Sequence, residues 1–278
     1  MGCFHRISAL GILAVLVLAA VGVAHSVPCV GTDTSGSERR VLLDCHFNNE
    51  WKKNATGTPV RYHYVWDDTA DSGFSHLAAI IKGAGGAVDT LCQAPTFTAL
   101  HRARIYVIVD PDTPEETEHP HYIDQKTTDV VTQWVKQGGL LVLLGNDKGK
   151  AEFEHLNHLA GLFGIRFNEN SRNRVTGRQF EIGTFDKLPD HPLFKGVKKI
   201  FIKELSTLQI EKPAAAVLSE GGDVIMAFSH FGKGGVFAVG DPWFYNEYMD
   251  HRRLPAGYEN SKAAENLFRW LLHFARHQ

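Results

Sequence analysis

Ile105-Tyr106-Val107-Ile108-Val109-Asp110 is an uninterrupted apolar run that ends in a carboxylate, and this stretch decides the fold. A short run without polar alternation is typical of a parallel strand that is buried on both faces. Residues 140–144 (LLVLL) have the same character, and residues 234–239 (GGVFAV) return to it late in the chain. These three runs predict the centre of a parallel sheet.

Segments with helical periodicity alternate with the apolar runs. The sequence predicts helices at residues 73–82, 124–136, 151–163 and 260–275, and further strands at 40–44 and 87–90. Strands that alternate with helices form parallel sheets, because the crossover helices cover both faces. The predicted fold class is therefore α/β, with a doubly wound, mostly parallel sheet.

The pattern changes in the C-terminal half of the chain. Short strands are predicted at residues 180–182, 199–202, 215–218 and 224–228, and tight turns separate them. Gly221-Gly222-Asp223 has the composition of a hairpin turn. We therefore expect an antiparallel β insertion or extension in this half.

The first residues resemble a cleaved export signal. Arg6 lies in a short basic region, residues 7–23 are apolar, and Ala24-His25-Ser26 offers small residues for cleavage. We expect a signal peptide at 1–26, a flexible leader at 27–38 and a single α/β domain at 39–278. A membrane anchor is the alternative, but the apolar run is slightly short for a spanning helix. The predicted location is secreted or periplasmic, without stable membrane association after cleavage.

Charge and cysteine content narrow the function classes. The net charge of −2 gives no general attraction to nucleic acid. Cleavage would leave Cys29, Cys45 and Cys92, and export permits one disulfide among them. Cys45 with Cys92 is one pairing, and buried free thiols are the alternative. We expect no cofactor and no bound metal.

Carboxylates follow several of the predicted strands. In open α/β sheets, ligands bind beyond the carboxyl ends of the strands. We therefore predict Asp110, Asp147 and Asp241 as catalytic residues. Asp147 is also the centre of Gly145-Asn146-Asp147-Lys148-Gly149, a strand-to-helix turn with the form of a nucleophile elbow. The alternative is that Asp147 caps the following helix.

Polar and aromatic side chains near these carboxylates are candidates for binding a ligand. The predicted substrate-binding residues are Asn49, Glu50, Asn146, Lys148, Arg172, Trp243, Asn246 and Glu247. Trp243 is proposed as a stacking platform, and the first long loop adds the aromatic residues Trp51, Tyr62, Tyr64 and Trp66. Aromatic faces beside carboxylates and amides suit sugar rings, although the same aromatics could instead pin loops to the core. Arg172, Arg174 and Arg178 could clamp a carboxylate such as a uronic acid, or form a solvated loop.

Several segments carry a resemblance to a known family. The elbow at 145–149 and the strand at 232–237, which ends in Gly240-Asp241, resemble the class I glutamine amidotransferase-like superfamily, including its ThuA-like branch. More specifically, residues 144–149, 152–157, 170–173 and 240–243 are similar to an uncharacterised domain joined to unsaturated rhamnogalacturonyl hydrolases. The resemblance implies a flavodoxin- or amidotransferase-like domain in a polysaccharide context. Amidotransferases carry a cysteine where Asp147 stands, so the usual thiolate route to glutamine hydrolysis is excluded.

These observations lead to three functional hypotheses. The first is an exported hydrolase that acts on pectin-like or other acidic polysaccharide fragments through its strand-end carboxylates. The second is a non-catalytic carbohydrate-binding or accessory module on a degenerate amidotransferase-like scaffold. The third is a partner-binding protein whose aromatic loops form an interface. The first two predict a carbohydrate ligand.

Overall fold

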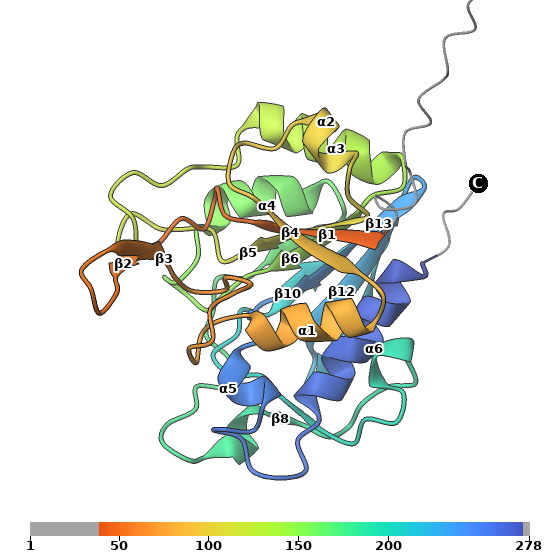
Figure 1. The fold of residues 1–278 in the computed structure, drawn as a ribbon. Helices are drawn as coiled ribbons and strands as arrows, with labels where there is room; N and C mark the ends of the chain where they lie inside the picture. The colour runs from red at the N-terminus through yellow and green to blue at the C-terminus, as the bar shows by residue number, and fades with distance from the viewer. Residues whose placement is uncertain (1–38, 275–278) are drawn as a thin grey trace, which may run out of the picture. The chain divides into compact units, whose positions relative to one another are not determined.

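The computed structural model describes residues 39–274, and the predicted signal peptide (1–26), leader (27–38) and Cys29 lie outside them. A nine-stranded sheet forms the centre of this part of the chain, in the order β4-β1-β5-β6-β13-β12-β10-β7, with β11 paired to β12 (Figure 1). None of the helices within 39–274 combines the length and the apolar character that a membrane crossing requires.

Five neighbouring strands are parallel. They are β4 (Ala87–Leu91), β1 (Arg40–Asp44), β5 (Ile105–Val109), β6 (Leu140–Leu144) and β13 (Gly234–Val239). In chain order this arrangement is 2-1-3-4-5, the flavodoxin-like order, and the winding direction reverses between β1 and β5. The predicted doubly wound, mostly parallel α/β fold is confirmed.

The other edge of the sheet is antiparallel, as the sequence predicts for the C-terminal half. β12 (Asp223–Phe231) pairs antiparallel with β13, β11 (Ala214–Glu220) and β10 (Leu208–Ile210), and β10 pairs with β7 (Ile165–Phe167). Gly221 and Gly222 make the β11–β12 turn with φ of +62° and +90°, values that favour glycine. The hairpin prediction is confirmed.

Helices cover both faces of the sheet (Figure 1). α1 (Ser75–Gly83) and α6 (Asn260–Leu272) pack in one hydrophobic cluster, and α2 (Phe97–Leu100), α3 (Gln125–Lys136) and α4 (Phe153–Gly161) pack in the other. Along β5, Ile105, Val107 and Val109 enter the first cluster, while Tyr106 and Ile108 enter the second. Since both faces are buried, the strand needs apolar residues at every position.

Short elements complete the described chain. They are the hairpin β2 (Trp51–Lys53) and β3 (Pro59–Arg61), the pair β8 (Thr184–Phe185) and β9 (Ile200–Phe201), α5 (Asn246–Met249), and 3₁₀ helices at Phe180–Gly183 and Pro192–Phe194. The strand predicted at 180–182 is therefore wrong. The amide of Ile182 donates to the carbonyl of Gln179 within a tight turn instead of to a neighbouring strand.

A disulfide joins the ends of two neighbouring strands. Cys45 follows β1, Cys92 follows the parallel strand β4, and their Cα atoms lie 4.4 Å apart. This spacing lies within the range that a disulfide spans. Of the alternatives that the sequence leaves open for these two cysteines, the structure has the bonded pair.

A close backbone contact at the end of β13 generates a stability prediction. A Cβ on Gly240 would lie 1.7 Å from the carbonyl oxygen of Ser206. Because this oxygen belongs to the backbone, it cannot move aside as the end of a flexible side chain could. We expect Gly240→Ala to lower the free energy of unfolding by at least the roughly 1–3 kcal/mol typical of overpacking. Urea unfolding monitored by circular dichroism measures this change. Gly83→Ala is the control, because its Cβ would have no heavy atom within 4 Å; equal effects from both substitutions would contradict the prediction.

Candidate functional site

The chain turns sharply after β1, and a buried carboxylate organises this turn. Asp44 accepts hydrogen bonds from the amides of His46, Phe47 and Asn48 at 3.2, 2.8 and 3.3 Å, and from the Tyr106 hydroxyl at 2.7 Å. Burial raises the pKa of Asp44 to about 6, although these hydrogen bonds oppose the increase. Asp44 thereby directs the loop that follows toward the end of β5.

Asp110 lies at the end of β5 and joins three segments. It adopts a positive φ of 44°, which is strained for a non-glycine residue. Its Oδ2 accepts hydrogen bonds from the Tyr64 hydroxyl at 2.7 Å and the Asn146 side-chain amide at 2.9 Å. Asn48 donates to its backbone carbonyl at 2.9 Å. The loops after β1, β5 and β6 therefore meet at this residue.

The three carboxylates predicted as catalytic lie at one edge of the sheet. Asp241 lies at the end of β13, where burial is the main cause of its raised pKa and the nearby carboxyl groups of Asp110 and Asp147 add to the increase. Asp147 lies on the outer side of the group, where it is half-buried and accepts a hydrogen bond of 2.7 Å from the Ser171 hydroxyl. The structure thus brings together side chains from three separate strand ends.

Two of these carboxyl groups are sealed from solvent. Asp110 is 4% exposed and Asp241 is 2% exposed. Burial raises the pKa of both groups well above the ordinary value, and neighbouring carboxylates add to the increase. The raised pKa favours the neutral form. A sugar outside the protein cannot contact either group without a rearrangement of the loops.

Asp147 does not form a nucleophile elbow. It is not among the non-glycine residues of 39–274 that adopt a positive φ, so the strained turn of an elbow is missing. α4 begins only at Phe153, and its N-cap is Glu152, which accepts from the amide of His155. The elbow prediction and the alternative cap prediction are both corrected, because a loop separates Asp147 from the helix.

Two predicted ligand-binding residues of the late loop are core residues. Trp243 is fully buried and packs in the same hydrophobic cluster as α1 and α6, so it offers no face for stacking. Asn246 is also fully buried; its side chain accepts from the amide of His76 and donates to the carbonyls of Asp68 and Ala70. Both predictions are corrected: these side chains pin loops to the core.

The remaining predicted binding residues differ in their surroundings. Arg172 pairs with Glu220 at 2.8 Å and with Asp223, which ties its loop to the β11–β12 hairpin. Lys148 is exposed, and Glu247 is half-buried with one carboxyl oxygen that lacks a hydrogen bond. Burial raises the pKa of Glu247. Glu50 lines the cavity described next, whereas Asn49 lies outside its lining and accepts hydrogen bonds from Trp51 and Arg61.

A cavity of about 560 Å³ lies beside the disulfide and is called the disulfide pocket here. Its lining includes Cys45, Cys92, Asn48, Glu50, Arg61, His63 and four aromatic residues of the first long loop, Trp51, Tyr62, Tyr64 and Trp66. It lies at β1 and the edge strand β4, on the side of β1 away from β5. In folds of this class, ligands bind outside the carboxyl ends of the strands.

Glu50 and His63 form a polar pair in the wall of the disulfide pocket. The Glu50 carboxylate lies 2.8 Å from Nδ1 of His63. Burial raises the pKa of Glu50, but hydrogen bonds from His63 and Tyr62 and the nearby charges outweigh it, so the net pKa is lowered. The same contact with Glu50 raises the pKa of Tyr62 to about 12. Glu50 therefore stays ionised and accepts hydrogen bonds.

The backbone is strained at this wall. His63 and Tyr64 have φ of 54° and 50°, and two hydrogen bonds hold the segment, from the Tyr64 amide to Ser72 and from its hydroxyl to Asp110. Strained non-glycine residues tend to gather at functional sites. Sequence reasoning missed His63, because its place opposite Glu50 depends on these backbone angles.

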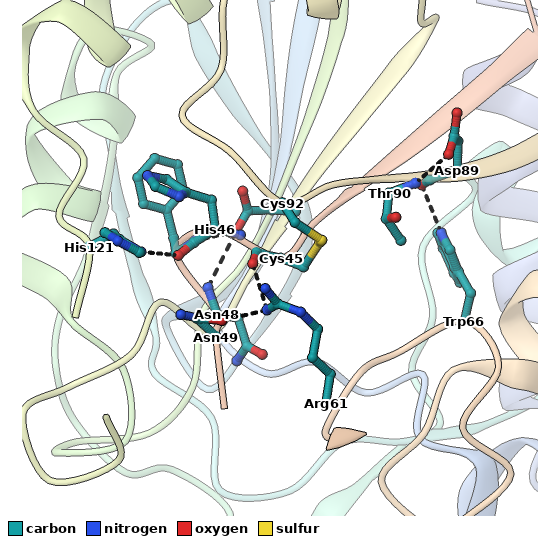
Figure 2. The surroundings of a disulfide bond; sticks show 12 residues. Cys45, His46, Asn48, Asn49, Arg61, Trp66, Asp89, Thr90, Cys92 and His121 are labelled. Atoms are coloured by element: carbon teal, nitrogen blue, oxygen red, sulfur yellow. Dashed lines mark hydrogen bonds between the residues drawn. A yellow bond between two sulfur atoms is a disulfide. The ribbon is translucent and has the colours of Figure 1, made fainter. Parts of the chain in front are cut away.

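Arg61 ties the β2–β3 hairpin to the disulfide, as Figure 2 shows. Its guanidinium donates to the Cys45 carbonyl at 2.9 Å and to the Asn49 side chain, and lies 4.7 Å above the Trp51 ring. Trp51 also donates its indole N–H to Asn49 at 3.0 Å. These contacts orient Trp51, which remains 53% exposed.

No group of three or more histidine, cysteine or acidic side chains within residues 39–274 is arranged to hold a metal ion.

Comparison with known proteins establishes the fold and nothing finer. No family model and no curated protein matches this chain. The N-terminal domain of mmIFT52 has a TM-score of 0.64 at 19% identity, covering 86% of this chain and 100% of that one. Cytoplasmic protein STM3548 from Salmonella typhimurium has a TM-score of 0.57 at 16% identity, covering 86% and 100%. A protein described as thua-like, from Bacteroides uniformis ATCC 8492, has a TM-score of 0.47 at 13% identity, covering 87% and 94%.

The sealed carboxyl of Asp110 generates a prediction about pH. The folded state keeps the proton on Asp110 to a higher pH than the unfolded state, so stability falls as pH rises above the unfolded pKa near 3.8. Asp110→Asn removes this titration. Above pH 4, we expect the free energy of unfolding of the variant to rise relative to that of the wild type by about 1.4 kcal/mol per pH unit. This rise should stop at the pKa of Asp110 in the folded state.

Urea unfolding at a series of pH values measures this difference. Asp186→Asn, which neutralises an exposed carboxylate, is the matched control and should parallel the wild type. Parallel pH curves for wild type and Asp110→Asn would show that Asp110 does not retain its proton on folding.

Proposed function

We propose that this chain is an exported, non-catalytic carbohydrate-binding module whose sugar site is the disulfide pocket. One observation carries the proposal: Trp51, Tyr62, Tyr64 and Trp66 line a single cavity together with the Glu50–His63 pair. The hydrolase hypothesis has the weaker support, because it needs carboxyl groups that a substrate can reach.

The chemistry of the disulfide pocket matches that of a sugar ring. A sugar presents apolar C–H faces, which pack on aromatic rings, and hydroxyl edges, which need donors and acceptors. Glu50 is itself buried and orients the ring of His63, which is 34% exposed and can exchange hydrogen bonds with hydroxyls. Arg61 supplies donors next to the exposed Trp51. Aromatic walls with a few placed polar groups are the usual composition of a ligand pocket.

The burial of Asp110 and Asp241 favours binding without turnover. Glycoside hydrolysis needs two carboxyl groups on either side of the scissile bond. Asp110 instead accepts hydrogen bonds from Tyr64 and Asn146, and both acids are at most 4% exposed. In this proposal they hold the loops that form the pocket.

The finer family assignment is part of the proposal. We propose that the domain belongs to the ThuA-like branch of the amidotransferase-like superfamily, on the strength of residues 144–149 and 240–243 and of the flavodoxin-like strand order. The two cysteines within residues 39–274 are joined to each other, which leaves no thiol nucleophile in this part of the chain.

Export is supported by two independent features. Residues 1–26 have the pattern of a cleaved signal peptide, and the Cys45–Cys92 disulfide persists in oxidising compartments. The proposed location is therefore secreted or periplasmic.

Titration calorimetry of the mature protein against neutral and pectic oligosaccharides tests the proposed site. We expect Trp51→Ala to weaken binding at least tenfold, because it removes a stacking face worth about 1.4 kcal/mol or more. Tyr122→Ala is the matched control, since Tyr122 is 41% exposed and lies outside the pocket lining. Equal affinities for Trp51→Ala and wild type would remove the pocket from consideration.

Product analysis after long incubation separates binding from hydrolysis. We expect the oligosaccharides to be recovered intact. Release of shorter products that Asp147→Asn abolishes would overturn the non-catalytic proposal in favour of the hydrolase.

A further inference from the structure

A second cavity, of about 590 Å³, lies among four segments of the chain and is called the arginine pocket here. They are the loop before α1, which contributes Asp71, residues 175–180, the end of β9, and α5 with the loop that follows it. Its volume is within the range of small-molecule sites. Its lining residues differ from those of the disulfide pocket.

Cationic side chains dominate the lining of the arginine pocket. The lining contains Arg178, Lys203, Arg252 and Arg253 but one carboxylate, that of Asp71, which contacts Arg252 and Arg253. Lys203 lies 3.2 Å from Glu204, and the carboxylates of Asp250 and Glu247 lie nearby. Lys203, Arg252 and Arg253 therefore each have a carboxylate partner, whereas no ion pair involves Arg178 among residues 39–274.

Two of the arginines are positioned by existing ion pairs. Arg253 donates two hydrogen bonds to one oxygen of Asp71, and Arg252 bonds to Asp250 at 2.7 Å and to Asp71 at 3.2 Å. A guanidinium has five N–H donors, so Arg253 keeps three for another acceptor. These arginines are therefore held in place with donor capacity to spare.

Arg178 differs from the other three cations. Its side chain is exposed and forms no ion pair or hydrogen bond with any residue in 39–274. A guanidinium at the mouth of a cavity, without a carboxylate of its own, is suited to an anion that enters from solvent.

Aromatic residues form the floor of the arginine pocket. Phe201 and Tyr248 belong to a small hydrophobic cluster, and the half-buried Phe180 packs against it. Burial raises the pKa of Tyr248, so its hydroxyl keeps its proton and can donate a hydrogen bond. The pocket thus offers an apolar surface below and cationic donors above.

We propose that the arginine pocket binds the carboxylate of an acidic sugar ring, with Arg178 and Lys203 as its ion-pairing groups and Phe180 against the ring. The sugar part of this inference rests on the proposed carbohydrate-binding function, whereas the recognition of a carboxylate does not. The two pockets then act as separate subsites, one for a neutral ring and one for an acidic ring of the same oligosaccharide class.

Calorimetry with galacturonate and galactose, which differ by one carboxylate, tests the assignment. The wild type should bind galacturonate more tightly than galactose, and 1 M NaCl should weaken only the galacturonate. We expect Arg178→Gln to weaken galacturonate about tenfold or more and to leave galactose unchanged. Arg174→Gln is the matched control, because Arg174 is exposed on the same loop and does not line the pocket.

Three outcomes would overturn the inference. Equal affinity of the wild type for both sugars would remove carboxylate recognition while leaving the disulfide pocket and the proposed function intact. Binding of sulfate but not of galacturonate, with the same dependence on Arg178, would replace the sugar ligand with an inorganic anion. An equal loss from Arg178→Gln and Arg174→Gln would show a diffuse charge effect. Trp51→Ala distinguishes the two proposals. It should weaken the binding of galactose, whereas the effect of Arg178→Gln on the affinity for galacturonate should remain.

Discussion

A buried hydrogen bond joins the hydroxyl of Tyr64 to the carboxyl of Asp110, and the architecture at this end of the sheet depends on it. Tyr64 belongs to the loop that carries the β2–β3 hairpin, whereas Asp110 ends a central strand. A neutral carboxyl is required there, because an isolated buried charge would be costly in a site this well sealed. Asn146 binds the same oxygen from the end of β6, so three loops share one fixed point. The cavity beside the disulfide has a defined shape because its outer wall is fastened to the core in this way.

The parallel half of the sheet could be predicted because a strand that is buried on both faces is a continuous run of apolar residues, which is visible in the sequence. β5 and β6 are buried at every position, so every residue is apolar. β7 and β10 were not predicted, because they lack such a run. Each has three residues of mixed burial, which is too short for a periodic pattern, and their pairing is fixed by β12 and its neighbours. The segment at 180–182 looks like a strand by composition, but no strand lies alongside to accept its hydrogen bonds.

The site was only partly predictable. Because parallel strands end at the same edge of a sheet, the sequence predicts that Asp110, Asp147 and Asp241 are neighbours, as the structure has them. It could not distinguish a sealed carboxyl from a reachable one, since that depends on how tightly the loops close. Trp243 shows the same ambiguity, because an aromatic residue after a strand suits a binding face and a core equally well. His63 was missed because two consecutive residues with positive φ place it against Glu50, and composition does not reveal backbone angles.

The hairpin between Trp51 and Arg61 is fastened at its base by Arg61, Asn49 and the disulfide, while residues 51–59 are all exposed. Substitutions along its tip should therefore cost little folding free energy, since no core contact is lost. Sequence changes in the hairpin can therefore accumulate without destabilising the sheet. That separation makes the hairpin the natural place for grafting new sequences, and for related chains to diverge in what they recognise while the framework stays constant.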